Sequence, residues 1–376
     1  MNIKEIAEIR RRINVKRSNV SDIYCCYVNT NKEILDDFDL SVGMMNESEK
    51  EMYFNLMKKV LSGTPGRNML DISFTTQQVM ESDRHKLLMT LRNTKLKDDE
   101  ARGTFFKLIT ESVELDSNYI ILLACDSYDV PKKGSDGENF DEASDAVFTY
   151  LICAVCPVKD GKAELGYAAR EKEFRCMSSD QRVTRTEFGF IFPAFDDRCA
   201  NIYNALFYSR STGEVHQEFI DSVFSTDPLM PADDQEKTFN GVMAEALAGE
   251  CSFDLVQTIH GELRDKVMKH KESKDPEPLE ISAEDIGDML KECGVSDEAA
   301  ESFEEKCSDQ FGKTVLTPGN LMNVKKFSIE APHIKISVEP DFSHLIESRI
   351  IDGKKYLLIP ANEGVEINGL DVKIKE

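Results

Sequence analysis

The chain begins with isoleucines spaced three or four positions apart, which is typical of an amphipathic helix. The spaced residues are Ile3, Ile6, Ile9 and Ile13. Arginines follow between and after them, so the pattern predicts a helix with one apolar face and one basic face. Further helices are predicted over 48–61, 83–91 and 97–113.

The densest apolar runs lie between residues 118 and 210. They are short, rich in Ile, Val, Phe and Tyr, and bounded by Gly, Pro and Asp, as buried strands are. The runs are Tyr119–Cys125, Val147–Pro157, Phe188–Phe195 and Ile202–Tyr208. We therefore expect a central, mainly antiparallel sheet.

The last third changes from helical spacing to alternation. Helices are predicted over 235–248 and 253–270, and again after Ser282. From Val324 onward apolar residues occupy every second position, which predicts short strands. The dipeptides Asp352-Gly353 and Asn368-Gly369 mark hairpin turns in this segment.

These patterns predict an α+β fold in three parts. Residues 1–226 form a mixed N-terminal domain around the central sheet. Residues 227–323 form a mainly helical, acidic segment, and residues 324–376 a small antiparallel β unit. At 376 residues the chain is long enough for more than one core.

Charge is distributed unevenly. The formal net charge is −23, which predicts a chain with little overall attraction for nucleic acid or anionic lipid. Residues 1–20 contain six basic and two acidic residues, whereas residues 271–310 contain fourteen acidic residues and four lysines. The acidic segment is a predicted binding surface for a basic protein partner.

Neither a membrane span nor a secretory signal is predicted. No apolar run approaches the ~20 residues that cross a bilayer, and the charged start is not a secretory signal. We expect a cytoplasmic protein without a membrane partner, and thiols rather than disulfides at its ten cysteines. No cofactor is indicated.

The Cys153-Ala-Val-Cys156 spacing occurs in redox centres and in zinc sites. Here it falls inside a predicted strand, where residues three apart point to opposite faces. Neither a second such pair nor a nearby pair of histidines completes a metal site. We predict buried core cysteines.

Carboxylates follow two of the predicted strands. They are Asp126, Asp129, Asp196 and Asp197. If they met at one sheet edge they could hold Mg²⁺ for phosphoryl transfer. The alternative is that they only end strands and form turns.

Two basic segments accompany predicted helices and could contact phosphates. Their candidate nucleic-acid-binding residues are Arg10, Arg11, Arg12, Lys16, Arg17, Arg84, Lys86, Arg92, Lys95 and Lys97. The alternative is that they form solvated helix faces.

Several segments, in order along nearly the whole chain, resemble the bacterial domain-of-unknown-function family 4317. The segments are Leu61–Asn68, Leu91–Asp99, Asp126–Pro131, Ala143–Asp145, Cys153–Val158 and Phe190–Arg198. The resemblance implies no activity and no catalytic residues.

The C-terminal third is also similar, in the order of its segments, to the ending of NdpA-type nucleoid-associated proteins and of the DNA-binding component of the Kiwa phage-defence system. The segments are Phe219–Phe239, Lys325–Phe327, Ile334–Ser337 and Ile350–Gly353. This resemblance implies a DNA-associated, dimeric protein.

Three hypotheses follow. The leading one is a non-enzymatic binding protein associated with DNA or the nucleoid through its basic helices. The second is a protein-interaction scaffold that uses its acidic segment. The third is a metal-dependent phosphoryl-transfer enzyme, which requires the four aspartates to meet.

Overall fold

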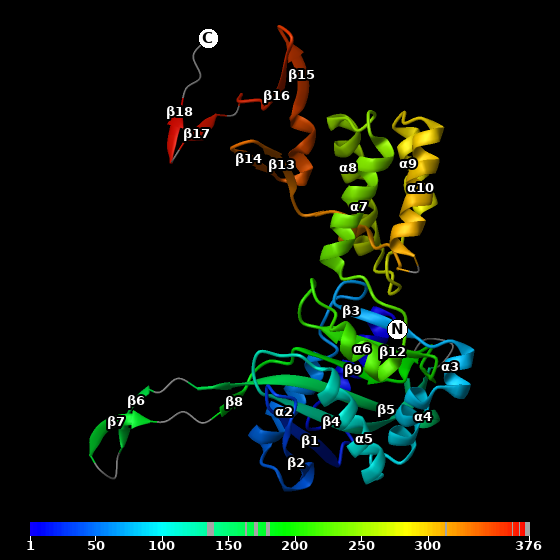
Figure 1. The fold of residues 1–376 in the computed structure, drawn as a ribbon, viewed down its shortest axis with the longest axis vertical. Coiled ribbons are helices and arrows are strands. Elements are labelled where there is room, and N and C mark those ends of the chain that lie inside the picture. The colour runs from blue at the N-terminus through cyan, green and yellow to red at the C-terminus, as the bar shows by residue number, and fades with distance from the viewer. Residues whose placement is uncertain are drawn as a thin grey trace. The chain divides into compact units, whose positions relative to one another are not determined.

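The computed structural model describes residues 1–133, 139–161, 164–168, 172–177, 181–312, 314–362, 364–367 and 369–372. The chain divides into two compact units. The first comprises Met1–Ala232 with Pro276–Pro278, and the second comprises Asp233–Asp275 with Leu279–Glu376. The predicted α+β class is confirmed (Figure 1). The predicted boundaries at 226 and 323 stay predictions.

The first unit is built on one sheet with the strand order β2-β1-β4-β5-β9-β12-β3, and β8 pairs with β5. Every neighbouring pair is antiparallel, as the sequence predicts. The strands are β1 (Asp22–Val28), β2 (Ile34–Ser41), β3 (Met69–Ser73), β4 (Tyr119–Lys133), β5 (Asn139–Asp160), β8 (Gln181–Val183), β9 (Phe188–Phe192) and β12 (Asn204–Ser209).

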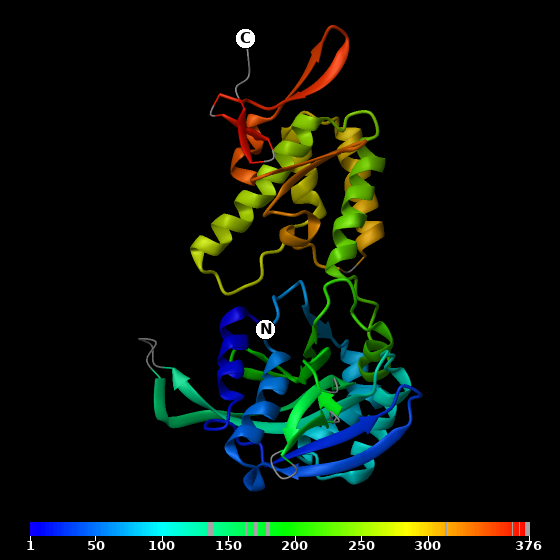
Figure 2. The same ribbon diagram turned by 90° about the vertical axis from the view of Figure 1, so that its left-hand side faces the viewer.

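Helices cover both faces of this sheet (Figures 1 and 2). One face packs against α1 and α2, through residues such as Ile9 and Met57. The other packs against α4, α5 and α6, through residues such as Leu91 and Phe105. The helices are α1 (Ile3–Arg12), α2 (Glu47–Lys59), α3 (Thr76–Glu81), α4 (Asp83–Asn93), α5 (Asp99–Ser112) and α6 (Gln217–Phe224), with a 3-10 turn η1 (Val42–Met44).

The central strands are apolar on both sides because each face has its own core. In β4, Ile121 and Leu123 face the core under α4 and α5, while Ile120 and Leu122 face the core under α1 and α2. This alternation explains the continuous apolar runs of the sequence.

The run Phe188–Phe195 is not one strand. It divides into β9 and β10 (Ala194–Asp196) at Pro193, which has no N–H to donate to a ladder. Two further strand pairs complete the described part of the first unit. They are β10 with β11 (Cys199–Asn201) and β6 (Glu164–Ala168) with β7 (Glu173–Met177).

The second unit begins with helices α7 (Ala232–Leu247), α8 (Phe253–Ser273), α9 (Ala283–Glu292), α10 (Asp297–Phe311) and α11 (Pro318–Leu321). The helix predicted after Ser282 is confirmed as α9. Ser282 and Asp285 form the reciprocal capping hydrogen bonds that begin it.

Three hairpins follow, confirming the predicted β segment. They are β13 (Phe327–Ala331) with β14 (Ile334–Val338), β15 (Glu347–Ile351) with β16 (Lys354–Leu358), and β17 (Val365–Ile367) with β18 (Leu370–Val372). A 3-10 helix η2 (Pro340–Leu345) joins the first two. Asp352-Gly353 forms the predicted turn, and Gly369 lies in the other, whose Asn368 is outside the described residues.

Among the described helices, none combines the length and the apolar content that a membrane span requires.

Candidate functional site

Helix α1 begins at a capping box and ends in cations. Asn2 accepts hydrogen bonds from two N–H groups of the first turn, and the Glu5 carboxylate accepts one from the Asn2 N–H. Ile6 and Ile9 are buried against the sheet. The predicted amphipathic helix is confirmed, with its basic residues at the C-terminal end, where the helix dipole favours positive charge.

Four cations at this end form no ion pair with another described residue. We call them the α1 cation group: Arg10, Arg11, Lys16 and Arg17. Arg11, Lys16 and Arg17 are exposed and Arg10 is half-buried. The turn that carries the last two follows α1 directly, because the Arg17 N–H donates to the Asn14 carbonyl. The group is therefore compact.

Arg12 differs from these neighbours. Its guanidinium lies over the Tyr128 ring, 4.5 Å from the centroid, in cation–π geometry. The Tyr128 hydroxyl donates to Glu8 at 2.6 Å, and burial with this contact raises the pKa of Tyr128 to about 12. Arg12 is thus part of the packing of α1 on β4.

Arg198, which the sequence analysis did not single out, also holds α1. It lies 2.8 Å from Glu8 and donates to the Pro131 carbonyl at 2.9 Å. Two segments that carry the family resemblance, Asp126–Pro131 and Phe190–Arg198, therefore meet beside α1. That shared resemblance was the only sequence signal for this contact.

Asp126 is a structural anchor. It is 1% exposed and accepts hydrogen bonds from the Ser18 hydroxyl, the Asn19 and Ser127 N–H groups and the Tyr150 hydroxyl, at 2.8–3.1 Å. Burial and the neighbouring carboxylate raise the pKa of Tyr150, which keeps its hydroxyl protonated as a donor. Asp126 thereby fixes the turn after α1 to β4.

The other predicted metal ligands are engaged elsewhere or exposed. Asp196 accepts from Asn201 at 2.8 Å and lies 2.9 Å from the Met1 amino group. Asp129 is exposed, and Asp197 has positive φ in the turn between β10 and β11. In the part of the chain that the structure describes, no group of three or more His, Cys, Asp or Glu could hold a metal ion.

The second basic group lies on the opposite layer of the sheet, with α4 and the loop after it. Lys86 lies 3.7 Å from Asp83 and Lys97 lies 3.1 Å from Asp22. Arg92 donates from Nε to the Thr149 carbonyl at 2.7 Å, and burial lowers the pKa of its guanidinium. Arg84 is half-buried and Lys95 exposed.

The ten predicted basic residues thus fall into two groups on opposite faces. Arg12 and Arg92 reach the same stretch of β4 and β5 from opposite sides, since Tyr128 and Thr149 occupy neighbouring rungs of one ladder. None of the α1 cation group forms an ion pair with another described residue, whereas in the second group Lys86 and Lys97 do.

The cysteine pair lies in the core as predicted. Cys153 faces the core under α4 and α5, and Cys156 faces the core under α1 and α2. Burial raises the pKa of the Cys153 thiol far above its ordinary value and that of Cys156 to about 12. The two sulfurs point away from each other, which excludes a joint redox or metal site.

In the folded protein we expect Cys199 and Cys251, which are exposed, to be alkylated at about pH 8, while Cys153 and Cys156 stay unmodified. Burial excludes the reagent, and the raised thiol pKa leaves little thiolate. Peptide mass mapping after alkylation, with and without urea, measures this. Rapid modification of Cys153 or Cys156 without urea would contradict the packing described.

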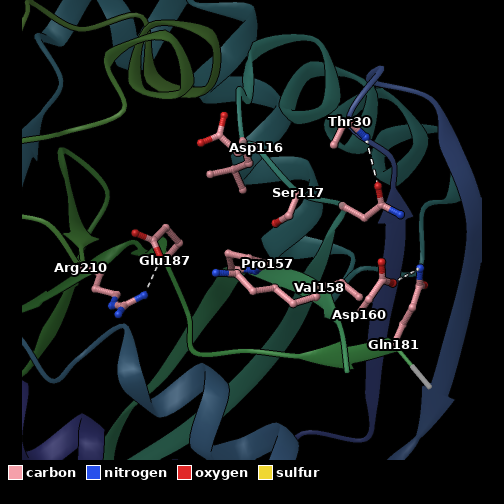
Figure 3. Close-up of a pocket in the computed structure, with 12 residues that line it drawn as sticks. Thr30, Asp116, Ser117, Pro157, Val158, Asp160, Gln181, Glu187 and Arg210 are labelled. Carbon is pink, nitrogen blue, oxygen red and sulfur yellow. Dashed lines mark hydrogen bonds and ion pairs between the residues drawn. The ribbon is translucent and has the colours of Figure 1, made fainter. Parts of the chain in front are cut away.

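A polar cavity of about 640 Å³ lies where several strands of the sheet end (Figure 3). Arg210 lies 3.0 Å from Glu187 on one side of it, and Gln181 donates to Asp160 at 3.4 Å on the other. These residues were missed because strand ends far apart in sequence assemble them. Neither His nor Cys is among the described residues that line it; its hydroxyl groups come from Thr30 and Ser117, and its charged groups include Lys159 and Arg210.

The acidic segment centres on α9 and α10. The lysines of both helices are paired, Lys291 with Glu304 at 3.5 Å and Lys306 with Glu245 of α7 at 3.2 Å. Glu298, Glu301 and Glu305 are exposed. A scaffold role for this surface stays a prediction.

Comparison with curated proteins finds no match. A family model described as "Domain of unknown function (DUF4317)" matches residues 1–370. The match covers both compact units and each of the segments on which the resemblance rests. The chain therefore belongs to the DUF4317 family.

Proposed function

We propose that this protein binds the phosphate backbone of nucleic acid through the α1 cation group. The observation that carries the proposal is the lack of ion pairs at Arg10, Arg11, Lys16 and Arg17 among the described residues, in a chain with 69 acidic residues. These four cations lie within eight positions of the sequence, at the end of one helix and in the turn after it, so they form a local positive site on a strongly acidic chain.

Stabilisation of the helix end alone does not explain why all four positions of the α1 cation group are positively charged. The dipole favours cations within the last turn of a helix, which covers Arg10 and Arg11. Lys16 and Arg17 lie beyond that turn and complement no helix end. A binding role explains all four positions.

The group is also held in place, which lowers the entropy lost on binding. The Glu8–Arg198 ion pair fixes the middle of α1, and Asp126 fixes Ser18 and Asn19, next to Arg17. The four charges are thus presented from a rigid base.

The net charge of −23 does not prevent such binding. At about 0.1–0.15 M salt, repulsion from distant carboxylates is screened beyond a Debye length of about 8–10 Å. Contacts of cations with phosphates act at shorter range and gain from counterion release. We expect weak binding without sequence preference, because backbone contacts carry no sequence information.

The experiment compares two variants that each lose four positive charges. One is R10Q/R11Q/K16Q/R17Q, and the other is R84Q/K86Q/K95Q/K97Q on the opposite layer. Anisotropy of a labelled DNA duplex at low salt measures affinity. We expect the first variant to lose at least about a hundred-fold in affinity and the second to change little.

The matched variant controls for net charge, and it should fold because exposed ion pairs such as Lys86–Asp83 contribute only about 0–1 kcal/mol. Circular dichroism checks both variants. Equal losses in the two variants, or no binding by the unaltered protein at low salt, would rule out the proposal.

A further inference from the structure

The C-terminal hairpins leave an unusual amount of apolar surface uncovered. Of 25 large hydrophobic side chains exposed in the described chain, eleven lie between residues 334 and 372. Ile350 is 72% exposed and Leu370 is 70% exposed. An exposed apolar region of this kind marks an interaction site.

The hairpins are also incomplete as sheets. Among the described residues, hairpin β15–β16 and hairpin β17–β18 are separate two-stranded sheets, so each has two edges to which no described strand pairs. Hairpin β15–β16 projects beyond the helices of its own unit in both views (Figures 1 and 2). A two-stranded hairpin is marginally stable by itself, and free edges are templates for further pairing.

The two hairpins differ in charge. Strand β16 begins with Lys354 and Lys355, while β17 and β18 carry Glu366 and Asp371 directly opposite each other. None of these four forms an ion pair with another described residue. The other face of β17–β18 is apolar, with Val365, Ile367, Leu370 and Val372. One hairpin thus offers positive charge and apolar surface, and the other negative charge and apolar surface.

We propose that two copies of this chain exchange these hairpins. In the dimer, β17–β18 of each copy adds to the edge of β15–β16 of the other. The exchange joins two-stranded sheets into four-stranded ones and pairs their free edges, so that apolar side chains of one hairpin lie beside those of the other. Lys354 and Lys355 point to opposite faces of β16, so one of them lies on the face that carries Glu366 and Asp371 of the partner. It is reciprocal, so a twofold axis closes the assembly.

The occupant is a second copy because the complementary surface is present on the chain itself. Within one chain the described strands of the two hairpins do not pair with each other. A different protein would need both kinds of charged hairpin to pair with both hairpins of this chain, whereas a second copy supplies both at once. The inference does not depend on nucleic-acid binding.

The test begins with the molar mass of the full chain by sedimentation equilibrium at several concentrations. We expect a species of twice the 42.5 kDa chain mass. The variants K354E/K355E and E366K/D371K should each dissociate at least about a hundred-fold more readily, because like charges then face each other. All four positions are exposed, so both variants should fold.

Mixing the two variants is the decisive step. In a dimer of either variant with itself, like charges face each other in both hairpin contacts. In the mixed dimer, opposite charges face each other in both contacts, so mixing the variants should restore association. Pairing of the hairpins within one chain predicts no such rescue. The variant K325E/K326E carries the same charge change outside these hairpins and should stay dimeric. A monomeric unaltered chain, or variants that fail to associate on mixing, would overturn the proposal.

Discussion

Replacing Asp126 by alanine is expected to lower the free energy of unfolding of the first unit by about 3–5 kcal/mol. The carboxylate is 1% exposed and accepts four hydrogen bonds. Its removal leaves the Tyr150 hydroxyl and the Asn19 and Ser127 N–H groups without an acceptor, and each unsatisfied buried donor costs about 1–3 kcal/mol. Urea unfolding followed by tyrosine fluorescence measures the change, since nine of the ten tyrosines lie in residues 1–226.

Asp129→Ala is the matched control. Asp129 lies on the same strand but is exposed, so its replacement should change stability by no more than about 0.5 kcal/mol. Asp126→Ala should also weaken nucleic-acid binding, because the turn that carries Lys16 and Arg17 loses its anchor. A variant as stable as Asp129→Ala would show that Asp126 does not hold α1 to the sheet.

Replacing Gly189 by alanine is expected to cost about 3 kcal/mol or more. Gly189 lies in β9 opposite Ala154 of β5. A Cβ there would come 2.2 Å from the Cys153 carbonyl oxygen and 2.8 Å from a Val60 methyl. The first is a backbone atom of a central strand, so it can move only if the sheet moves. The same urea experiment measures the loss.

Gly103→Ala is expected to raise the stability of the first unit instead. Gly103 is exposed within α5, and a Cβ there meets nothing within 4 Å. Alanine should stabilise the helix by about 0.5–1 kcal/mol. A tolerated Gly189→Ala would contradict the close packing of β5, β9 and α2.

Local patterns predicted those elements whose burial follows their own sequence. The isoleucines of α1, the apolar runs of β4, β5 and β12, and the alternation of the hairpins each carry a periodicity that matches the observed element. The opposite facing of Cys153 and Cys156 follows from strand geometry alone. These predictions did not require knowledge of the tertiary contacts between elements.

Other features depend on partners that are distant in sequence. Strand β2 carries three aspartates and little burial, since it is an edge strand, and its pairing with β1 has no signal of its own. The same holds for β3, which is a strand because β12 lies beside it. Neither was predicted.

The candidate site shows the same limit. The sequence indicated a basic face on α1, but the Glu8–Arg198 contact joins residues 190 positions apart. The topology also places α1 and α4 on opposite faces, so the ten similar cations fall into two groups that cannot form one surface. The face on which each helix packs depends on how the chain connects the strands, which local sequence patterns do not show.

The salt dependence of DNA binding tests the central claim most directly. Each phosphate neutralised contributes about −0.9 to the slope of log affinity against log salt concentration. For the four cations of the α1 group we predict a slope of roughly −3 to −4 for the unaltered protein and a slope near zero for R10Q/R11Q/K16Q/R17Q. A slope unchanged by those substitutions, or no measurable affinity at low salt, would contradict the assignment of this surface to nucleic acid.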